Sequence, residues 1–302
     1  MKRRAFLGGA SLFFLARPSR ADAGDSKRVV LGQFHTSYAV DAEHKARASN
    51  VQLAAEAIDG KKIADGATFS FNDAVGERTA AFGYSKAVVL RDGLIAEGMG
   101  GGACQVASTL YAAALLAGID IQSRVAHSRP SAYIRMGFDA TVSYPKLDLK
   151  LTNTLGEEVT VRARAANGNL DVAFEGITFR DVELTSEVLE RIPFTRALER
   201  DPSVGPDEAR RTAFGIPGYR VRRVRTYGLP DGTLHRDVRI DHYPPVAEIL
   251  KVAPGFDAAR LSAPEDEEHE AMAKVRIVTA PEAVRPLVVQ LRPATLVTLM
   301  NK

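Results

Sequence analysis

The single cysteine, Cys104, is the residue whose chemistry most needs an explanation. It follows Gly98, Gly100, Gly101 and Gly102, and it precedes a segment whose apolar spacing predicts a helix. The start of a helix presents free N–H groups and about half a positive charge, which favours a thiolate and lowers the pKa of a thiol. The same N–H groups could stabilise an oxyanion. This pattern predicts a nucleophilic thiol.

Two later residues could activate this thiol. His127 closes a predicted strand, where a base could face Cys104, and Asp139 follows at a distance that would let it orient the imidazole. The order of nucleophile on a helix, strand, histidine and acid is similar to papain-like and transglutaminase-like acyltransferases, by analogy alone. The predicted catalytic residues are therefore Cys104, His127 and Asp139.

Each of these residues also has a purely structural interpretation. Cysteine is among the most buried residue types, so Cys104 could simply pack a tight glycine-rich turn. His127 could be a histidine that follows a strand at the surface, and Asp139 could cap a turn. The residues alone leave both interpretations open.

Other residues near these positions are candidates for binding a substrate. The glycines would let the backbone approach a ligand, and side chains four and seven positions after Cys104 would share its helix face. An arginine among apolar neighbours could bind a carboxylate or form a structural ion pair. His35 could line the same cleft. The predicted substrate-binding residues are Gly100, Gly101, Gly102, Gln105, Ser108, Tyr111, Asn72 and Arg78.

No pattern predicts a metal or another cofactor. His235, His242 and His269 lack the spacing of metal ligands. Glycines 98–102 are not followed by a suitable acidic ribose ligand, as a dinucleotide site requires.

Hydrophobic periodicity predicts the elements that position these residues. The fold expected is α+β: a mixed sheet with a helix after the glycine-rich loop, followed by a smaller β-rich C-terminal part. An Asn167-Gly168 pair predicts a tight hairpin. Expected helices cover 48–58 and 105–117, and expected strands cover 30–38, 68–72, 87–90, 119–127, 147–151, 159–163, 170–174, 219–226 and 233–242.

Composition and turn signals divide the chain into five segments. Residues 180–217 are charged, contain proline and show no clean period, which predicts a linker with one short helix at most. The expected division is a signal peptide over 1–23, a core domain over 24–178, a linker over 179–213, a small β module over 214–256 and a C-terminal tail over 257–302.

The N-terminus predicts export. Lys2, Arg3 and Arg4 precede a short apolar run, and a small-x-small site ends at Ala23. The arginine pair resembles a twin-arginine signal, although an ordinary Sec signal can also carry two arginines. We therefore expect a periplasmic or otherwise exported protein, with no membrane span once the signal is removed.

Composition narrows the class of protein. The chain of 302 residues is 45% hydrophobic and 25% charged, which is typical of a soluble globular protein. Its net charge of +3 comes from the signal region, whose five basic groups and one acidic group leave about −1 on the rest. Nucleic acid is therefore not an expected partner. One cysteine also excludes an internal disulfide.

A series of ordered motifs resembles the VanW family, which is named from an accessory gene of vancomycin-resistance clusters. The motifs are Phe34-x-Thr36-x-Tyr38, Ala48-Ser49-Asn50-Val51, Phe69-Ser70-Phe71-Asn72, Val75-Gly76-x-Arg78-Thr79, Gly83-Tyr84, Gly100-Gly101-Gly102-x-Cys104-Gln105, Ser108-Thr109-Leu110-Tyr111, His127-Ser128, Gly137-x-Asp139-Ala140 and Asp148-Leu149-Lys150-Leu151-x-Asn153. Ordered blocks of this kind are more specific than any single motif. Residues 218–252 more weakly resemble a small glycine-containing β module that often follows VanW regions.

The resemblance implies an exported bacterial cell-envelope protein. With the thiol, it predicts a cysteine-dependent acyltransferase or peptidase acting on peptidoglycan peptide. The alternative is a non-catalytic module that binds peptidoglycan or an envelope partner, and a third is a purely structural envelope protein. The expected partner is a cell-wall peptide or another envelope component.

Overall fold

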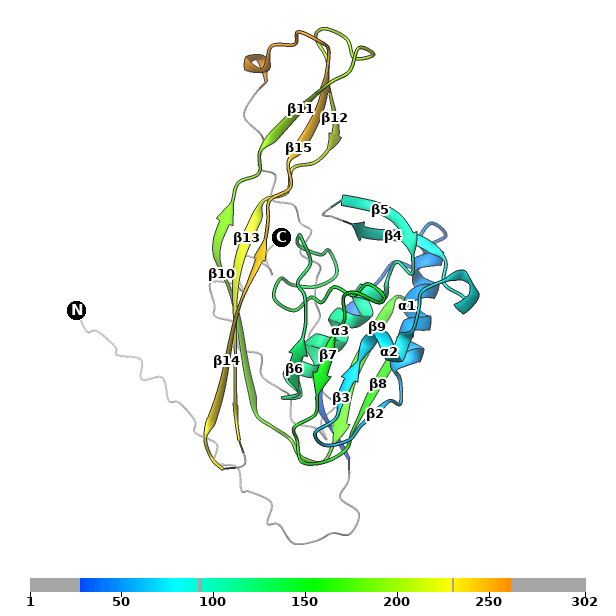
Figure 1. Ribbon diagram of the computed structural model, residues 1–302, viewed down its shortest axis with the longest axis vertical. Helices are drawn as coiled ribbons and strands as arrows, with labels where there is room; N and C mark the ends of the chain where they lie inside the picture. Colours follow the sequence, from blue (N-terminus) through cyan, green and yellow to red (C-terminus); the bar gives the residue numbers. More distant parts are fainter. Residues whose placement is uncertain (1–27, 92–93, 230, 262–302) are drawn as a thin grey trace, which may run out of the picture.

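The computed structural model describes residues 28–91, 94–229 and 231–261 (Figure 1). The expected signal peptide and most of the expected tail after residue 257 lie outside these ranges. Within the described ranges, no helix is both long and apolar enough to cross a membrane.

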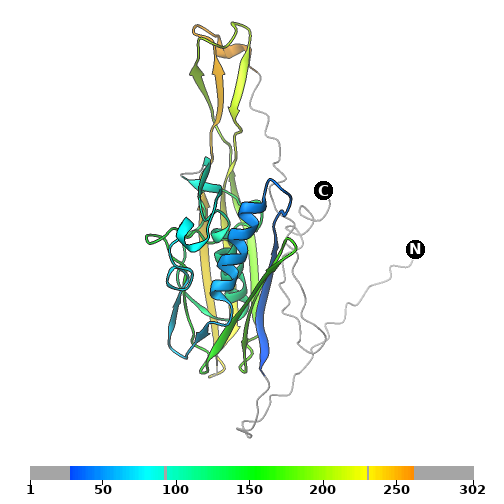
Figure 2. The ribbon, with the colours of Figure 1, turned by 90° about the vertical axis from the view of Figure 1, so that its right-hand side faces the viewer.

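The core is a four-stranded sheet with two helices on one face (Figure 2). Helix α1 packs against β8, and α3 packs against β1 and β9. All neighbouring strands are antiparallel, so the expectation of a mixed core sheet was wrong. For one of these pairs the reason is local, because Asn167 and Gly168 both have positive φ and close a tight hairpin between β8 and β9. In sheet order the strands are β1 (Val29–Ser37), β9 (Asn169–Gly176), β8 (Val159–Ala166) and β2 (Lys62–Ile63), and the helices are α1 (Lys45–Ile58) and α3 (Ala103–Leu116).

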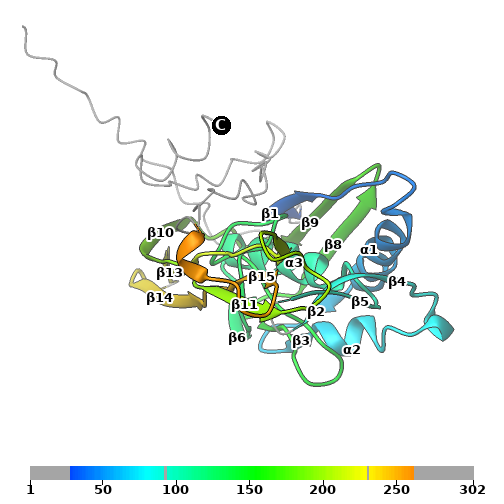
Figure 3. The ribbon, with the colours of Figure 1, turned by 90° about the horizontal axis from the view of Figure 1, so that it is seen from above.

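Helix α3 is the centre of the molecule. All but one of its residues are buried, which agrees with a sequence rich in alanine and leucine. Seen from above, it lies between the four-stranded sheet and the C-terminal strands (Figure 3). The helix predicted over 105–117 is confirmed, with a start two residues earlier and Gly118 in the left-handed conformation just after its end.

A second, smaller sheet in the order β3-β7-β6 lies beside the core. The strand predicted over 68–72 ends at Ser70, whose hydroxyl caps a short helix by accepting from the Asp73 N–H at 3.0 Å. The strand predicted over 119–127 ends at Ser123, so His127 lies in a loop. A strand does cover the segment predicted over 87–90, but Val88 in it is 53% exposed, so the strand is not buried as expected. The elements are β3 (Thr68–Ser70), α2 (Phe71–Val75), η1 (Ala80–Phe82), β4 (Lys86–Arg91), β5 (Leu94–Met99), β6 (Asp120–Ser123) and β7 (Lys150–Thr152).

The C-terminal part is an elongated arrangement of strands (Figure 1). The hairpin predicted between 219–226 and 233–242 is confirmed. The linker expected over 179–213 was wrong, because three strands occupy that segment and one of them pairs with the hairpin. One sheet has the order β10 (Val182–Ile192), β13 (Gly218–Gly228), β14 (Leu234–Tyr243); the other has β11 (Arg196–Arg200), β15 (Glu248–Val252), β12 (Ala209–Ala213); η2 (Ala258–Arg260) follows.

Candidate functional site

The glycine-rich loop places the start of α3 against the rest of the core. Gly100 has φ 72° and Gly102 has φ 118°, both in the region that favours glycine. A Cβ on Gly100 would lie 2.5 Å from Cβ of Arg78, and one on Gly102 would lie 2.8 Å from a methyl group of Val51. The loop therefore needs glycine for both its turns and its close contacts.

Cys104 lies in the first turn of α3 and is only partly buried. Its Sγ lies 3.4 Å from the backbone oxygen of Val142 and 3.5 Å from the Val142 nitrogen. These are weak contacts for a thiol, and they hold Sγ beside the segment that follows Asp139.

His127 and Asp139 form a hydrogen-bonded pair in the vicinity of the thiol. His127 Nδ1 lies 2.8 Å from Asp139 Oδ2, and the same oxygen accepts the His127 backbone N–H at 2.6 Å. Asp139 therefore fixes the ring through Nδ1, and the interaction of His127 with Cys104 lowers the pKa of the thiol. His127 is 5% exposed and Asp139 1%. Base and orienting acid are thus in direct contact, and the thiol lies close enough for the imidazole to act on its pKa.

The electrostatics of this group favour an ion pair. Burial raises the pKa of Cys104, but the hydrogen bond and charge of His127 outweigh burial, and the pKa is lowered from its ordinary value. Burial lowers the pKa of His127, but Tyr133, Asp139 and Cys104 outweigh it and hold the pKa well above its ordinary value. A lowered thiol pKa beside a raised imidazole pKa favours thiolate with imidazolium near neutral pH.

Three of the predicted binding residues carry buried polar atoms without a hydrogen-bond partner among the described residues. They are the three guanidinium nitrogens of Arg78, Oδ1 of Asn72 and the hydroxyl of Tyr111. Burial lowers the pKa of Arg78, while its charge lowers the pKa of Cys104. Because an unpaired buried cation is costly, these donors point to a ligand that is not part of the chain.

The remaining predicted binding residues serve the structure. Gln105 is 1% exposed, and its amide binds Thr36, Ser37 and Arg47. Ser108 accepts the Ala140 N–H at 2.9 Å and so ties the segment after Asp139 to α3. Tyr111 is fully buried with its ring 5.0 Å from the Arg124 guanidinium carbon, and a Cβ on Gly101 would meet the Val88 carbonyl oxygen at 2.5 Å. These four residues therefore pack and bond the elements that surround the site.

Residues that sequence reasoning missed complete the surroundings of His127. Tyr133 Oη lies 3.3 Å from His127 Nε2, on the side that also faces Cys104. Arg124 donates to Asp139 Oδ1 at 2.9 Å and to the Asp139 backbone oxygen at 2.5 Å. Both lie within six residues of His127, but in irregular backbone where no periodicity marks a shared side.

The expected oxyanion site is narrower than the whole glycine loop. The N–H groups of Ala103 and Gln105 donate to the carbonyls of Gly100 and Gly102 at 3.1 and 3.0 Å. Among the described residues, the N–H groups of Gly101, Gly102 and Cys104 have no such acceptor. These donors at the helix start remain for an oxyanion.

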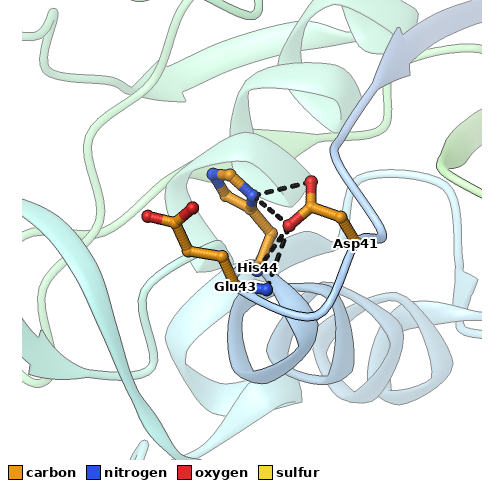
Figure 4. Close-up of side chains that lie close together, drawn as sticks. All are labelled: Asp41, Glu43 and His44. Carbon is orange, nitrogen blue, oxygen red and sulfur yellow. Dashed lines mark hydrogen bonds and ion pairs between the residues drawn. The ribbon is translucent and has the colours of Figure 1, made fainter.

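An exposed group at the start of α1 is a second cluster of possible ligand atoms (Figure 4). Oxygen and nitrogen atoms of Asp41, Glu43 and His44 lie within 4.8 Å of one another. Asp41 accepts the backbone N–H groups of Glu43 and His44 at 3.0 and 3.1 Å and lies 2.8 Å from His44 Nδ1. These contacts shape the turn before α1, so the cluster has a sufficient structural role.

A second buried histidine is separate from the thiol site. His35 Nδ1 lies 2.8 Å from Asp171, and Nε2 lies 3.3 Å from Ser37. Thr36 points the other way and contacts Thr109 of α3 at 2.9 Å. Because successive side chains of a strand alternate between faces, His35 lies on the face of β1 opposite to α3 and does not line the cleft as expected.

Comparison with known proteins agrees with the motifs. The family described as VanW like protein matches residues 46–175. The chain is 37% identical over 163 residues to the uncharacterized protein YoaR of Bacillus subtilis, covering 54% of this chain and 52% of YoaR. It is 31% identical over 109 residues to the vancomycin B-type resistance protein VanW of Enterococcus faecalis, covering 34% of this chain and 40% of that protein. The chain thus spans about half, or less, of the length of these relatives.

Among solved structures, a G5 domain is similar over a short region. An IgA1 protease G5 domain covers 25% of this chain and 92% of its own, with 17% sequence identity and a TM-score of 0.19. A similarity at this level supports no conclusion about the C-terminal strands.

Proposed function

Residues 46–175 belong to the VanW-like family, and from that premise we propose that the chain is an exported, thiol-dependent acyltransferase or peptidase that acts on peptidoglycan peptides. The observation that carries the proposal is the placement of a partly exposed Cys104 beside a buried, hydrogen-bonded His127–Asp139 pair. Triads are recognised by the geometry and roles of their members.

In the proposed reaction, Cys104 Sγ attacks the carbonyl carbon of a peptide bond, and a C–S bond forms. His127 gives its proton to the amine as the C–N bond breaks, and the amine leaves. Water or a second amine then attacks the thioester, His127 takes a proton from it, and the C–S bond breaks to restore the thiolate. The Cys104 N–H would stabilise the oxyanion at each stage.

Three features support a cell-wall peptide as the substrate. The N-terminal sequence has the pattern of an export signal, and one relative is named a vancomycin resistance protein. Arg78 offers unpaired donors near Cys104, and cell-wall peptides carry free carboxylates that an arginine can bind.

A second candidate function, a non-catalytic module that binds the same peptides, is favoured by Arg78 alone. An arginine clamp needs no nucleophile, so binding would persist with an unreactive thiol. The two functions differ in the titration of Cys104.

Replacement of His127 by alanine is expected to raise the pKa of Cys104. The variant loses the interactions that lower this pKa while burial, which raises it, remains. Alkylation by iodoacetamide at pH 7 should therefore slow by about tenfold or more. The rate would be measured against pH by mass spectrometry on the chain without residues 1–23.

His35→Ala is the matched control, because it removes another buried histidine bound to an aspartate, on the opposite face of the core sheet. It should leave the alkylation profile of Cys104 unchanged. A wild-type thiol with an ordinary profile, indifferent to His127, would leave the binding module as the function.

Replacement of Arg78 by methionine is expected to weaken substrate binding without weakening the fold. The buried guanidinium lies over the Phe71 ring but has no hydrogen-bond partner among the described residues, so a methionine of similar length should keep or raise the melting temperature. Affinity for a disaccharide tetrapeptide, measured calorimetrically with Cys104→Ala protein, should fall by about tenfold or more. With Arg78 unchanged, a peptide whose free carboxylate is amidated should bind more weakly than the free peptide by the same factor.

Arg47→Met provides the control for this experiment. Arg47 also lies near Cys104, but it donates to Gln105 Oε1 at 2.8 Å. Its replacement should lower the melting temperature and leave the preference for the free carboxylate intact. Equal affinities of the Arg78 variant and the wild type would exclude Arg78 as the clamp.

A further inference from the structure

Strand β14 reaches the thiol site from outside the family-matched residues 46–175. The hydroxyl of Tyr243, its last residue, contacts Asp139 Oδ1 at 2.5 Å and accepts the Gly137 N–H at 2.7 Å. Tyr243 is fully buried. The hydroxyl therefore contacts the carboxylate that orients His127.

A second residue of β14 acts on the same carboxylate through an arginine. Asp241 is 5% exposed and forms an ion pair with Arg124, which in turn donates to the backbone and side chain of Asp139. Arg239 donates to the Arg124 backbone oxygen at 2.8 Å. Arg124 is thus held between β14 and Asp139, and its charge is shared by two carboxylates.

The β13–β14 hairpin contacts the core along a seam that contains both apolar packing and hydrogen bonds. Met136, Val221 and Tyr243 form a buried apolar cluster. On the neighbouring strand, Arg225 donates to the Ile119 backbone oxygen at 2.7 Å, and Tyr227 donates to Asp120 at 2.9 Å. The hairpin is therefore fixed against the segment that carries Arg124 and His127.

We propose that β14 is a working part of the thiol site, in which Tyr243 and Asp241 are positioning residues that act on His127 through Asp139 and Arg124. This proposal rests on the proposed function, because it assumes that Cys104 and His127 react as a pair.

The geometry of the Asp139 carboxylate explains the role of Tyr243. Oδ1 is bound by Tyr243 and Arg124, and Oδ2 by the backbone and ring nitrogens of His127. With Oδ1 engaged on one side, the carboxylate cannot rotate away from the ring. Preorganisation of this kind keeps a base in place without help from the substrate.

Charge explains the role of Asp241. Its carboxylate offsets the Arg124 cation, so that Asp139 keeps its negative charge for the imidazolium of His127. Without Asp241, Arg124 would be balanced by Asp139 alone. Asp139 and Tyr133 act on His127, and Arg78 and Arg47 interact with Cys104. Arg124 and Tyr243 interact with Asp139, and Asp241 interacts with Arg124 and Tyr243.

The first experiment compares Asp241→Asn with Asp237→Asn in the chain without residues 1–23. Both aspartates lie on β14 and bind buried arginines, but Asp237 binds Arg223 at 2.9 Å and has no contact with Arg124 or Asp139. Removing the Asp241 charge disfavours the imidazolium of His127 and favours the thiolate of Cys104, so the pKa of each group falls. Both transitions in the plot of alkylation rate against pH should therefore move to lower pH. We expect a shift of about half a pH unit or more for Asp241→Asn and none for Asp237→Asn.

The second experiment compares Tyr243→Phe with Tyr227→Phe. Each removes one hydroxyl from the seam and keeps the ring, but only Tyr243 contacts Asp139. The proton on Nδ1 of His127, observed by NMR at low field, should exchange faster with water in Tyr243→Phe. Tyr227→Phe should leave it unchanged.

The outcomes separate this proposal from the proposed function. A wild-type thiol with ordinary titration would overturn both. The role of β14 alone would be overturned by a different set of results. In that case the thiol pKa of the wild type depends on His127, but the Asp241→Asn profile matches that of Asp237→Asn and the Tyr243→Phe proton signal matches that of Tyr227→Phe.

Discussion

Replacement of Cys104 by serine is expected to reduce turnover of a cell-wall peptide by at least about 10³-fold. A serine hydroxyl titrates far above a thiol, so the interaction with His127 that lowers the pKa of Cys104 cannot generate a comparable nucleophile. The fold should persist, because Sγ makes only weak contacts with Val142, which a hydroxyl can also make. Products from peptidoglycan fragments would be followed by mass spectrometry.

The control for this experiment is the melting temperature and peptide affinity of the same variant. Both should stay close to those of the wild type, which separates a lost nucleophile from a lost fold or a lost binding site. Turnover within about tenfold of the wild type would exclude Cys104 as nucleophile. A wild type that binds the peptide without converting it would favour the binding module.

Replacement of Asp139 by asparagine is expected to lower both turnover and stability. The amide cannot hold the imidazolium of His127 as the carboxylate does, and the comparable change in a serine triad costs about 10⁴-fold. It also removes the negative partner of the buried Arg124, which should cost about 3 kcal/mol of unfolding free energy. Peptide turnover and urea unfolding would measure the two effects.

The stability difference should depend on pH in a defined direction. Burial raises the pKa of Asp139, but hydrogen bonds from His127 and the charge of Arg124 outweigh it, and the pKa lies well below its usual range. The ionised carboxylate therefore stabilises the fold fully above its unfolded pKa of about 3.9 and loses this effect as the pH falls below it. The wild type and the asparagine variant should approach each other in stability only at such acidic pH.

Asp171→Asn is the matched control. Asp171 lies 2.8 Å from Nδ1 of His35, as Asp139 does from His127, but its side chain is 59% exposed and distant from the thiol. Its replacement should leave turnover unchanged and cost little stability. Equal losses in both variants would mean that Asp139 has no special role at the thiol.

The difference between prediction and structure is clearest in the C-terminal strands. In β10, Val182, Leu184 and Ser186 are buried in alternation, but charged neighbours and a polar inward residue obscure the pattern. In β13, Arg223 and Arg225 are buried although their residue type predicts exposure. Their charges are met by Asp237 on the neighbouring strand, a pairing that only the register creates.

The sequence by itself determined the local parts of the candidate site. The glycines before Cys104 and the apolar run after it specify a turn and a buried helix, because backbone freedom and apolar spacing act over a few residues. For the same reason the Asn167-Gly168 hairpin was predictable. The order of Cys104, His127 and Asp139 along the chain also suggested their contact.

The tertiary structure alone decided what holds those residues in place. Arg124 meets Asp241 across 117 positions of the chain, and Asp139 meets Tyr243 across 104. Neither contact has a local signal, because a buried charge or hydroxyl is tolerated only where a distant partner satisfies it. The sequence therefore indicates a thiol with its base and acid, whereas the packing of β14 against the core determines their surroundings.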